Sequence, residues 1–289
     1  MNVGIWNYLS TVDAIDPAVL AKRAEELAFD SVWLPEHPIM PVVTHTPFPL
    51  GGPIPAFYGE WMDPLVALAR ASAVTQSIML GTGICLVPER NPLLLAKEIA
   101  TLDHLSGGRF CFGIGAGWLK EETDIMGGDF AHRWRQTREA VLAMKALWRT
   151  DEAEYHGRYY DFPPVRSSPK PVQQPHPPII LGTITASQRV FQRIVAWGDG
   201  WMPLGISIEE LKRGRETLNR LAAEAGRDPR SIRILAFASP DPEALQAYRD
   251  AGVDTVLLTL QTAGEKEALA KLEEMAQRVL GARHQENRR

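Results

Sequence analysis

Strand-like and helix-like segments alternate along the whole chain. Short apolar runs predict strands, and longer segments with apolar positions three and four residues apart predict helices. Leu20, Ala24, Leu27 and Ala28, for example, form one face of the first predicted helix. The predicted strands occupy residues 3–9, 31–37, 78–87, 109–115, 178–182, 200–204, 231–238 and 255–260.

The starts of three helices are marked by the sequence itself. Asp16-Pro17, Asp63-Pro64 and Asn91-Pro92 each place a capping side chain before a proline. Asp and Asn accept hydrogen bonds from the first free amides of a helix, and proline suits its first position.

Eight strand–helix pairs in sequence imply parallel strands joined by right-handed crossovers. Eight is also the number of strands that closes a barrel of this kind. We therefore predict an α/β fold of the (β/α)8 TIM-barrel type, with residues 1–289 as a single domain. An open, doubly wound sheet is the alternative.

Two proline-rich stretches interrupt the alternation, at residues 38–61 and 151–177. Proline interrupts both helices and central strands, so these stretches are predicted as long loops. Loops of this length in a compact domain are usually lids or binding loops. The fold is thus expected to carry insertions after strand 2 and before strand 5.

Composition excludes several classes of partner. The apolar fraction is 45%, the charged fraction 23% and the net charge −4. This balance gives no basic surface for nucleic acid or for a membrane. No apolar run approaches the ~20 residues of a membrane span, and no signal peptide is visible. Cys85 and Cys111 lie in apolar runs, which indicates buried free thiols and a cytoplasmic protein.

Barrel enzymes place their chemistry where the strands end. The predicted strand ends offer neither a cluster of metal ligands nor a Schiff-base lysine nor paired acids, so we expect no metal. The ends are apolar and glycine-rich, which suits a large planar cofactor that carries the chemistry. Trp33, Trp118 and Trp201 are candidates for the walls of its site, although Trp33 is equally a core candidate.

Glu36-His37 is the one ionisable pair at a predicted strand end. Histidine titrates near neutral pH, so His37 is a candidate for moving the substrate proton. A purely structural hydrogen bond is the alternative. Neighbouring residues of a strand point to opposite sides, so Glu36 and His37 cannot both face the barrel axis. Glu36 is then a candidate for orienting a helix or loop.

Two further segments suit a phosphate-bearing cofactor. Residues 113–117 form a glycine run after a strand, whose amides can face an anion, although such a run also occurs in ordinary turns. Residues 182–187 offer amides and hydroxyls at the start of a helix, which is either an anion site or simple capping. The predicted cofactor residues are Trp6, Gly83, Ile84, Gly115, Ala116, Gly117, Trp118, Gly182, Thr183, Thr185 and Ser187.

Several runs, in order along the chain, resemble the bacterial luciferase-like superfamily, and most closely its coenzyme F420-dependent oxidoreductases. They lie at residues 24–33, 36–37, 80–84, 90–97, 101–109, 113–118, 169–173 and 198–201. The resemblance implies a dehydrogenase or reductase that moves hydride between F420 and a small organic substrate. A two-component monooxygenase using reduced FMN and dioxygen, with a separate flavin reductase, is the alternative, and a barrel that binds flavin without turnover is a third reading.

The resemblance also implies features of individual residues. The position of Gly83-Ile84 is a non-prolyl cis peptide in relatives, and His37 matches a histidine that serves as base, with Glu36 as its acidic neighbour. A homodimer is implied as well. The chain departs from the sugar-phosphate dehydrogenases of the family, which carry an acid at Trp118, and from the usual Gly-Gly at Gly182-Thr183.

Overall fold

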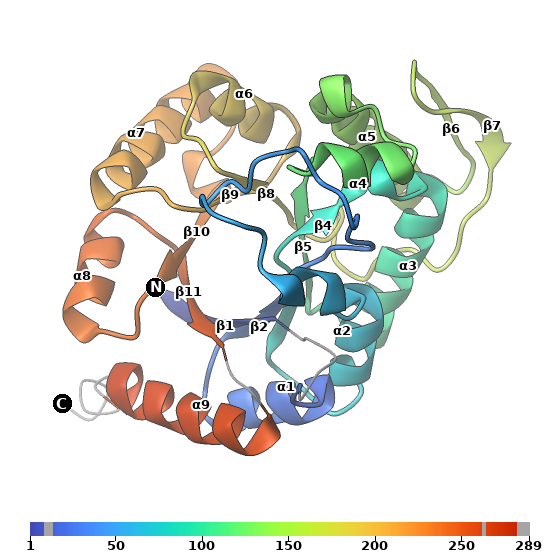
Figure 1. Ribbon diagram of the computed structural model, residues 1–289. Coiled ribbons are helices and arrows are strands. Elements are labelled where there is room, and N and C mark those ends of the chain that lie inside the picture. The colour runs from blue at the N-terminus through green and yellow to red at the C-terminus, as the bar shows by residue number, and fades with distance from the viewer. Residues whose placement is uncertain (9–13, 262–263, 282–289) are drawn as a thin grey trace.

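A closed ring of eight parallel strands forms the centre of the molecule (Figure 1). The computed structural model describes residues 1–8, 14–261 and 264–281. Around the ring each strand pairs with its neighbours, and the β3–β5 pairing completes the closure. The predicted barrel is confirmed and the open sheet is excluded. The strands are β1 (Asn2–Asn7), β2 (Ser31–Leu34), β3 (Met79–Thr82), β5 (Phe110–Gly115), β8 (Ile179–Thr183), β9 (Gly200–Pro203), β10 (Arg233–Ala238) and β11 (Thr255–Leu260).

The third predicted strand is not continuous, which corrects the expected single strand at residues 78–87. It divides into β3 and a short β4 (Cys85–Leu86), with Gly83 and Ile84 between them. The two halves differ in their pairing: β3 pairs with both β2 and β5, while β4 pairs with β5 alone among the described strands. The peptide bond between Gly83 and Ile84 is cis, as the resemblance implied.

One helix follows each barrel strand and packs on the outside of the ring (Figure 1). Asp16, Asp63 and Asn91 cap their helices through side-chain oxygens, each with proline in the first turn. The outer helices are α1 (Pro17–Glu26), α2 (Pro64–Ser72), α3 (Pro92–Leu105), α5 (Arg133–Arg149), α6 (Gln188–Trp197), α7 (Ile208–Glu224), α8 (Pro242–Asp250) and α9 (Glu265–Val279).

Both predicted insertions are present. After β2 the chain crosses one end of the barrel, and η1 (Ala56–Glu60) lies in this segment (Figure 1). Before β8, the antiparallel strands β6 (Ala153–His156) and β7 (Asp161–Val165) form a hairpin outside the barrel. The sequence did not predict the short helix α4 (Lys120–Ile125) after β5. Short 3-10 turns complete the fold at η2 (Val87–Glu89), η3 (Phe130–His132) and η4 (Pro229–Ser231).

Two apolar clusters stabilise the fold. The larger fills the layer between the strands and the outer helices, and the smaller lies inside the ring. Trp6 and Trp33 are the largest members of the inner cluster. Gly81 makes room for Trp33, because a Cβ atom there would lie 2.2 Å from the indole ring. Among the described helices, none has the length and apolar character needed to cross a bilayer.

Candidate active site

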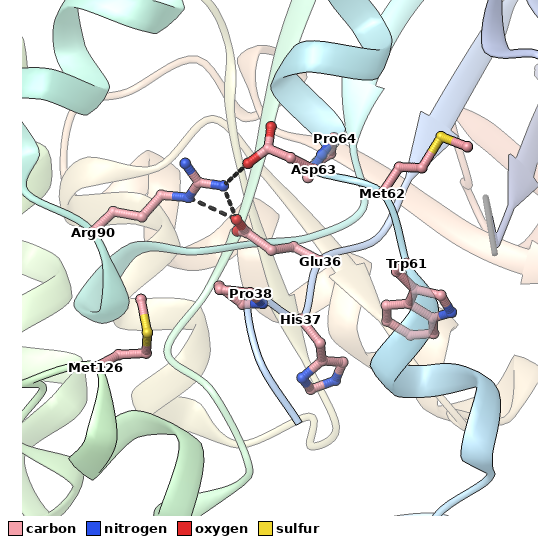
Figure 2. A pocket seen from close by; sticks show the side chains of 9 residues that line it. All are labelled: Glu36, His37, Pro38, Trp61, Met62, Asp63, Pro64, Arg90 and Met126. Atoms are coloured by element: carbon pink, nitrogen blue, oxygen red, sulfur yellow. Dashed lines mark hydrogen bonds and ion pairs between the residues drawn. The ribbon is translucent and has the colours of Figure 1, made fainter. Parts of the chain in front are cut away.

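Two consecutive residues after β2 send their side chains in opposite directions. Figure 2 shows Glu36 directed toward Arg90 and His37 directed away from it. Glu36 Oε2 accepts a hydrogen bond of 2.7 Å from the Leu86 amide, and Glu36 Oε1 pairs with the Arg90 guanidinium. Arg90 also reaches Asp63, with 2.5 Å between Nη2 and Oδ2. Glu36 thus joins β2, β4 and the start of α2, as expected for a residue that orients its surroundings.

His37 has a buried carboxyl partner that the sequence did not reveal. Its Nδ1 lies 2.7 Å from Oε2 of Glu122, a residue of α4, and both side chains are almost completely buried. Burial lowers the pKa of His37 to about 4, although Glu36 opposes this shift. Burial likewise raises the pKa of Glu122 to about 8.

At neutral pH these shifts leave both groups uncharged. The Glu122 hydroxyl then donates to Nδ1, and the single ring proton of neutral His37 is on Nε2. The described side chain that exchanges a proton with His37 is therefore Glu122 of α4, and not its sequence neighbour Glu36.

Aromatic rings surround His37 on its open side. The ring centroids of Trp61, Tyr58 and Trp118 lie 5.1, 5.4 and 5.8 Å from that of His37. Phe48 contacts both Tyr58 and Trp118. Three of these four rings come from the insertion after β2, so this segment forms an aromatic cover over the imidazole. The indole nitrogen of Trp61 is buried and has no hydrogen-bond partner among the described residues.

A cavity of about 240 Å³ lies beside these groups (Figure 2). Its wall combines the ion pair of Glu36 and Arg90 with apolar side chains of α4 and of the segment before α2. The lining residues are Glu36, His37, Pro38, Trp61, Met62, Asp63, Pro64, Arg90 and Met126.

The aromatic cover is fastened to α4 by Glu121. The two oxygens of this carboxylate accept bonds from the His45 amide at 2.6 Å, the Thr46 amide at 3.1 Å and the Thr46 hydroxyl at 2.7 Å. The Thr46 hydroxyl and these amides lower the pKa of Glu121 to about 2. The carboxylate therefore remains charged and bound over the whole range in which the protein would work.

Several predicted cofactor residues meet at the end of the barrel. Trp6 Nε1 donates a hydrogen bond of 2.6 Å to the Gly83 carbonyl. The Ile84 side chain occupies space that Cβ atoms on Gly115 and Gly182 would fill, at 2.0 and 2.6 Å. The glycines thus allow Ile84 to lie across the ring of strands.

Above the inner cluster, this end of the barrel is apolar and only partly buried. Tyr8, Ile84 and Phe237 pack on the inner cluster without being enclosed by it. A partly buried apolar floor of this kind fits a planar ring system, which would be held by dispersion and by the exclusion of water.

The segments expected at a cofactor's phosphate lie beside this floor. Ser187 immediately precedes α6 and its side chain makes no capping bond, so the amides of Gln188 and Arg189 have no side-chain cap from it. The Thr183 hydroxyl donates to the Thr185 carbonyl at 3.0 Å. Arg189 and Arg193 stand on the first turns of α6, and burial followed by the charges of Arg189 and Arg133 lowers the pKa of Arg193. Arginines at the start of a helix are typical of anion-binding sites.

The loop after β5 is shaped by Gly117, whose φ of +78° is left-handed. Its carbonyl accepts a bond of 3.0 Å from Arg133 Nε, which links the loop to the start of α5. Ala116 is buried here, while Trp118 reaches the ring of His37.

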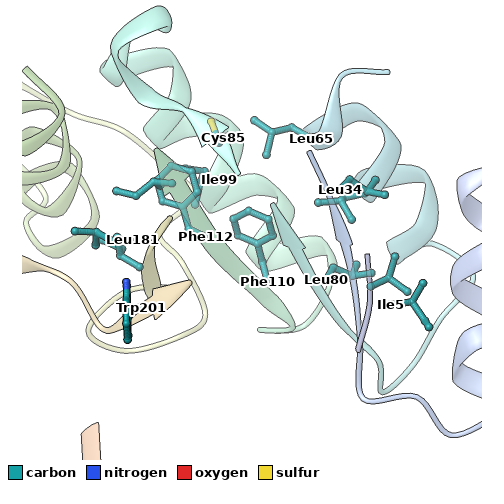
Figure 3. Packing of buried hydrophobic residues seen from close by; sticks show 14 of the residues in the cluster. Ile5, Leu34, Leu65, Leu80, Cys85, Ile99, Phe110, Phe112, Leu181 and Trp201 are labelled. Atoms are coloured by element: carbon teal, nitrogen blue, oxygen red, sulfur yellow. The ribbon is translucent and has the colours of Figure 1, made fainter. Parts of the chain in front are cut away.

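Only one of the three candidate tryptophans lies next to His37. Trp118 does so, whereas Trp33 is buried inside the barrel, where its indole donates to the Ser31 hydroxyl. Trp201 is fully buried in the larger apolar cluster (Figure 3). Its ring lies edge-on to that of Phe191. The prediction that Trp201 forms a wall of the cofactor site is therefore wrong. The position of Trp201 in β9 directs the side chain outward, away from the axis.

The structure adds partners that the sequence could not identify. Glu122, Arg90 and Trp61 reach the site from separate elements, and none of them stands at a predicted strand end. An acidic residue on the first turn after a Gly-x-Gly-Trp segment was the available signal for Glu122. Among the described residues no group of histidine, cysteine and carboxylate side chains could hold a metal ion.

Comparisons with known proteins agree with this architecture. The family model for luciferase-like monooxygenases matches residues 10–289. An uncharacterized protein of Mycobacterium tuberculosis is 36% identical over 270 residues, which cover 92% of this chain and 94% of the relative. The monooxygenase RslO1 of Streptomyces bottropensis superposes with a TM-score of 0.77 at 23% identity, over 98% of this chain and 99% of its own. The coenzyme F420-dependent tetrahydromethanopterin reductase of Methanopyrus kandleri superposes with a TM-score of 0.72 at 18% identity, over 97% and 99% of the two chains. The chain belongs to the luciferase-like monooxygenase family of oxidoreductases.

Proposed function

We propose that this protein transfers hydride between coenzyme F420 and a small organic substrate at the end of the barrel where His37 lies. The observation that carries the proposal is the buried bond between His37 and Glu122 beneath an aromatic cover. Hydride transfer to or from a carbon–oxygen bond requires one proton to move as well. An imidazole with a proton-holding partner supplies that proton.

The predicted residues fit the cofactor as follows. The apolar floor of Tyr8, Ile84 and Phe237, with Trp6 and Gly83 under it, would hold the ring system, and Gly115 and Gly182 leave the space that Ile84 occupies there. The cofactor would supply the gain or loss of a hydride at one ring carbon. The start of α6 would hold the phosphate, and the residues that would hold it and the adjoining tail are Ala116, Gly117, Trp118, Thr183, Thr185 and Ser187.

His37 moves the proton in this scheme, and Glu36 has a positioning role through Arg90. In carbonyl reduction, Nε2 of His37 gives its proton to the substrate oxygen as the carbon receives hydride. Nδ1 takes the Glu122 proton at the same time, so His37 stays neutral and Glu122 becomes a carboxylate. The unpartnered indole N–H of Trp61 is a second donor to the substrate oxygen.

Cofactor binding and turnover separate this function from its alternatives. We expect F420 to bind, as followed by its fluorescence, and to change redox state with a panel of alcohols and carbonyl compounds. His37→Ala should bind F420 as well as the wild type does and lose turnover. Equal loss of both would make the histidine structural, and binding without turnover across the panel would favour a non-enzymatic role.

A monooxygenase that uses reduced FMN and dioxygen is the second candidate. Its support is the similarity to the monooxygenase of Streptomyces bottropensis, which spans nearly all of both chains. A separate flavin reductase would then be the partner. Oxygen consumption with reduced FMN, without turnover of F420, would establish this candidate in place of the first.

We further propose that the chain acts as one domain in the cytoplasm and as a homodimer, without a nucleic-acid or membrane partner. Light scattering at several protein concentrations tests the dimer. A constant mass of 32.1 kDa, that of one chain, would contradict it.

A further inference from the structure

A second carboxyl group lies buried behind the partner of His37. Glu89, in η2, is 3% exposed and Glu122 is fully buried. Oε2 of Glu89 and Oε1 of Glu122 form no hydrogen bond of good geometry among the described residues, although the Ile39 amide lies close enough to Glu122 to oppose the rise of its pKa. A buried carboxylate with an unbonded oxygen is unfavourable, whereas a protonated carboxyl tolerates burial far better. Both groups therefore favour holding a proton.

Thr123 allows Glu89 to gain or lose that proton without a change of structure. Its hydroxyl lies 2.9 Å from Glu89 Oε1 and 3.1 Å from the Leu119 carbonyl. One hydroxyl proton serves only one acceptor at a time. With Glu89 ionised, Thr123 donates to it. With Glu89 protonated, Thr123 donates to Leu119 and accepts from Glu89. Gly117 leaves space for this contact, since a Cβ atom there would lie 3.0 Å from both oxygens.

The groups around Glu89 shift its pKa in both directions, with a net rise. Burial and the neighbouring Glu122 raise the pKa of Glu89 to about 8, and Glu36 adds to the shift while Arg90 and the Thr123 bond oppose it. Glu36 and Arg90 largely neutralise each other through their ion pair. Once Glu122 is ionised, its charge is therefore the dominant one that Glu89 meets, and Glu122 in turn faces His37.

We propose that Glu89 and Glu122 form a two-carboxyl proton store beside His37, in which Glu89 is a positioning residue that acts through Glu122. When Glu122 gives its proton to Nδ1 of His37, the new carboxylate raises the proton affinity of Glu89, so the store loses one proton and keeps the other. The role of His37 in turnover rests on the proposed function, but the store itself does not.

Infrared spectroscopy of the protein without cofactor tests the store directly. The carbonyl stretch of protonated carboxyl groups should be present at about pH 6, where ordinary carboxyls are ionised, and should disappear in two steps by about pH 10. The second step belongs to the carboxyl that faces an ionised neighbour. Glu89→Gln and Glu122→Gln should each lack that upper step. In Glu122→Gln, the midpoint of the remaining infrared titration, that of Glu89, should fall by about one pH unit or more, because the charge of Glu122 is absent.

Asp124→Asn is the matched control, because this exposed residue lies on the same helix and should leave both steps unchanged. Absence of the band in the wild type at about pH 6 would overturn the store, and this measurement needs no variant to fold. Two steps that persist in Glu89→Gln would remove Glu89 from it. If the protein turns over F420 but lacks the infrared band of protonated carboxyls, the proposed function holds and the store does not. If the band is present but no turnover is found, the store holds and the proposed function does not.

Discussion

At the scale of single residues, the site is governed by groups whose pKa values differ from those of the same groups in water. His37 is neutral because burial disfavours the imidazolium, and Glu122 is protonated because burial disfavours the carboxylate. Together they form a neutral donor, with the exchangeable proton on Nε2. Trp118 contacts the ring of His37 at the position where the resemblance implies an acid in sugar-phosphate dehydrogenases, so we expect a substrate of another class.

The donor form of this pair sets a pH dependence. Because the pKa of Glu122 is raised to about 8, the donor is complete below that pH and is lost above it. The rate of carbonyl reduction should therefore fall as pH rises through about 8. Glu122→Gln should lower kcat by about 10²-fold, within the usual contribution of acid–base groups, and remove the alkaline fall. Stopped-flow measurements of hydride transfer across the pH range check both. An alkaline fall retained in the variant would assign it to another group.

At the scale of elements, the short helix α4 connects three parts of the site. Its consecutive residues Glu121, Glu122 and Thr123 bind the aromatic cover, His37 and Glu89 respectively. A displacement of this helix would thus alter the cover and the proton chain together. The aromatic cover and the acid–base groups are therefore coupled through the six residues of α4.

The Glu121→Ala variant tests whether Glu121 holds the aromatic cover on α4. The variant loses the three bonds to residues 45 and 46, so limited proteolysis within residues 38–55 should become at least several-fold faster. KM should rise because the aromatic wall is no longer fixed. Asp124→Ala is the control, since its exposed ion pair with Lys120 contributes little to stability. Equal cleavage of both variants would show that Glu121 does not hold the cover.

The start of α6 makes a separate prediction about the cofactor. Arg189→Ala should weaken cofactor binding about 10-fold, as expected for one charge near a phosphate, and should reduce its dependence on salt. The Arg220→Ala variant is the control, because Arg220 pairs with Glu224 on the exposed face of α7. Titration by fluorescence at two salt concentrations provides the measurement. Equal affinities for the two variants would place the phosphate elsewhere.

At the scale of the whole molecule, the repeating pattern predicted the barrel and its insertions well. These predictions rest on signals that are local in the sequence. Capping residues followed by proline mark the starts of three helices, and prolines mark both long loops. The division of β3 from β4 was missed because residues 78–87 read as one apolar run. Partners of the site were missed for a different reason. The bond from Glu122 to His37 spans 85 residues, and no local pattern encodes such a contact.

One surface carboxylate joins distant parts of the ring and offers a test of stability. Glu25 Oε1 accepts bonds from the amides of Gln76, Ser77 and Ile78, so the end of α1 fixes the entry into β3. Although burial opposes the shift, these amides lower the pKa of Glu25 to about 2. Its contribution is therefore complete above the ordinary carboxyl pKa and is lost as pH falls toward 2.

Glu25→Gln should lower the free energy of unfolding by roughly 1 kcal/mol at neutral pH, since charged acceptors bind amides more strongly than neutral ones. The difference from wild type should shrink as the solution is acidified. Urea unfolding at several pH values provides the measurement. Glu26→Gln, next to it and exposed, is the control. A difference that stays constant down to low pH would contradict the assignment.

The indole of Trp6 stands immediately under the apolar floor, hydrogen-bonded to the Gly83 carbonyl and edge-on to Tyr8 and Phe237. A chromophore resting on that floor would lie within energy-transfer range of this ring. Emission from Trp6 should then dim in proportion to occupancy, and Trp6→Phe should remove that part of the quenching. The fluorescence of Trp6 would thus report the occupancy of the barrel without an added label.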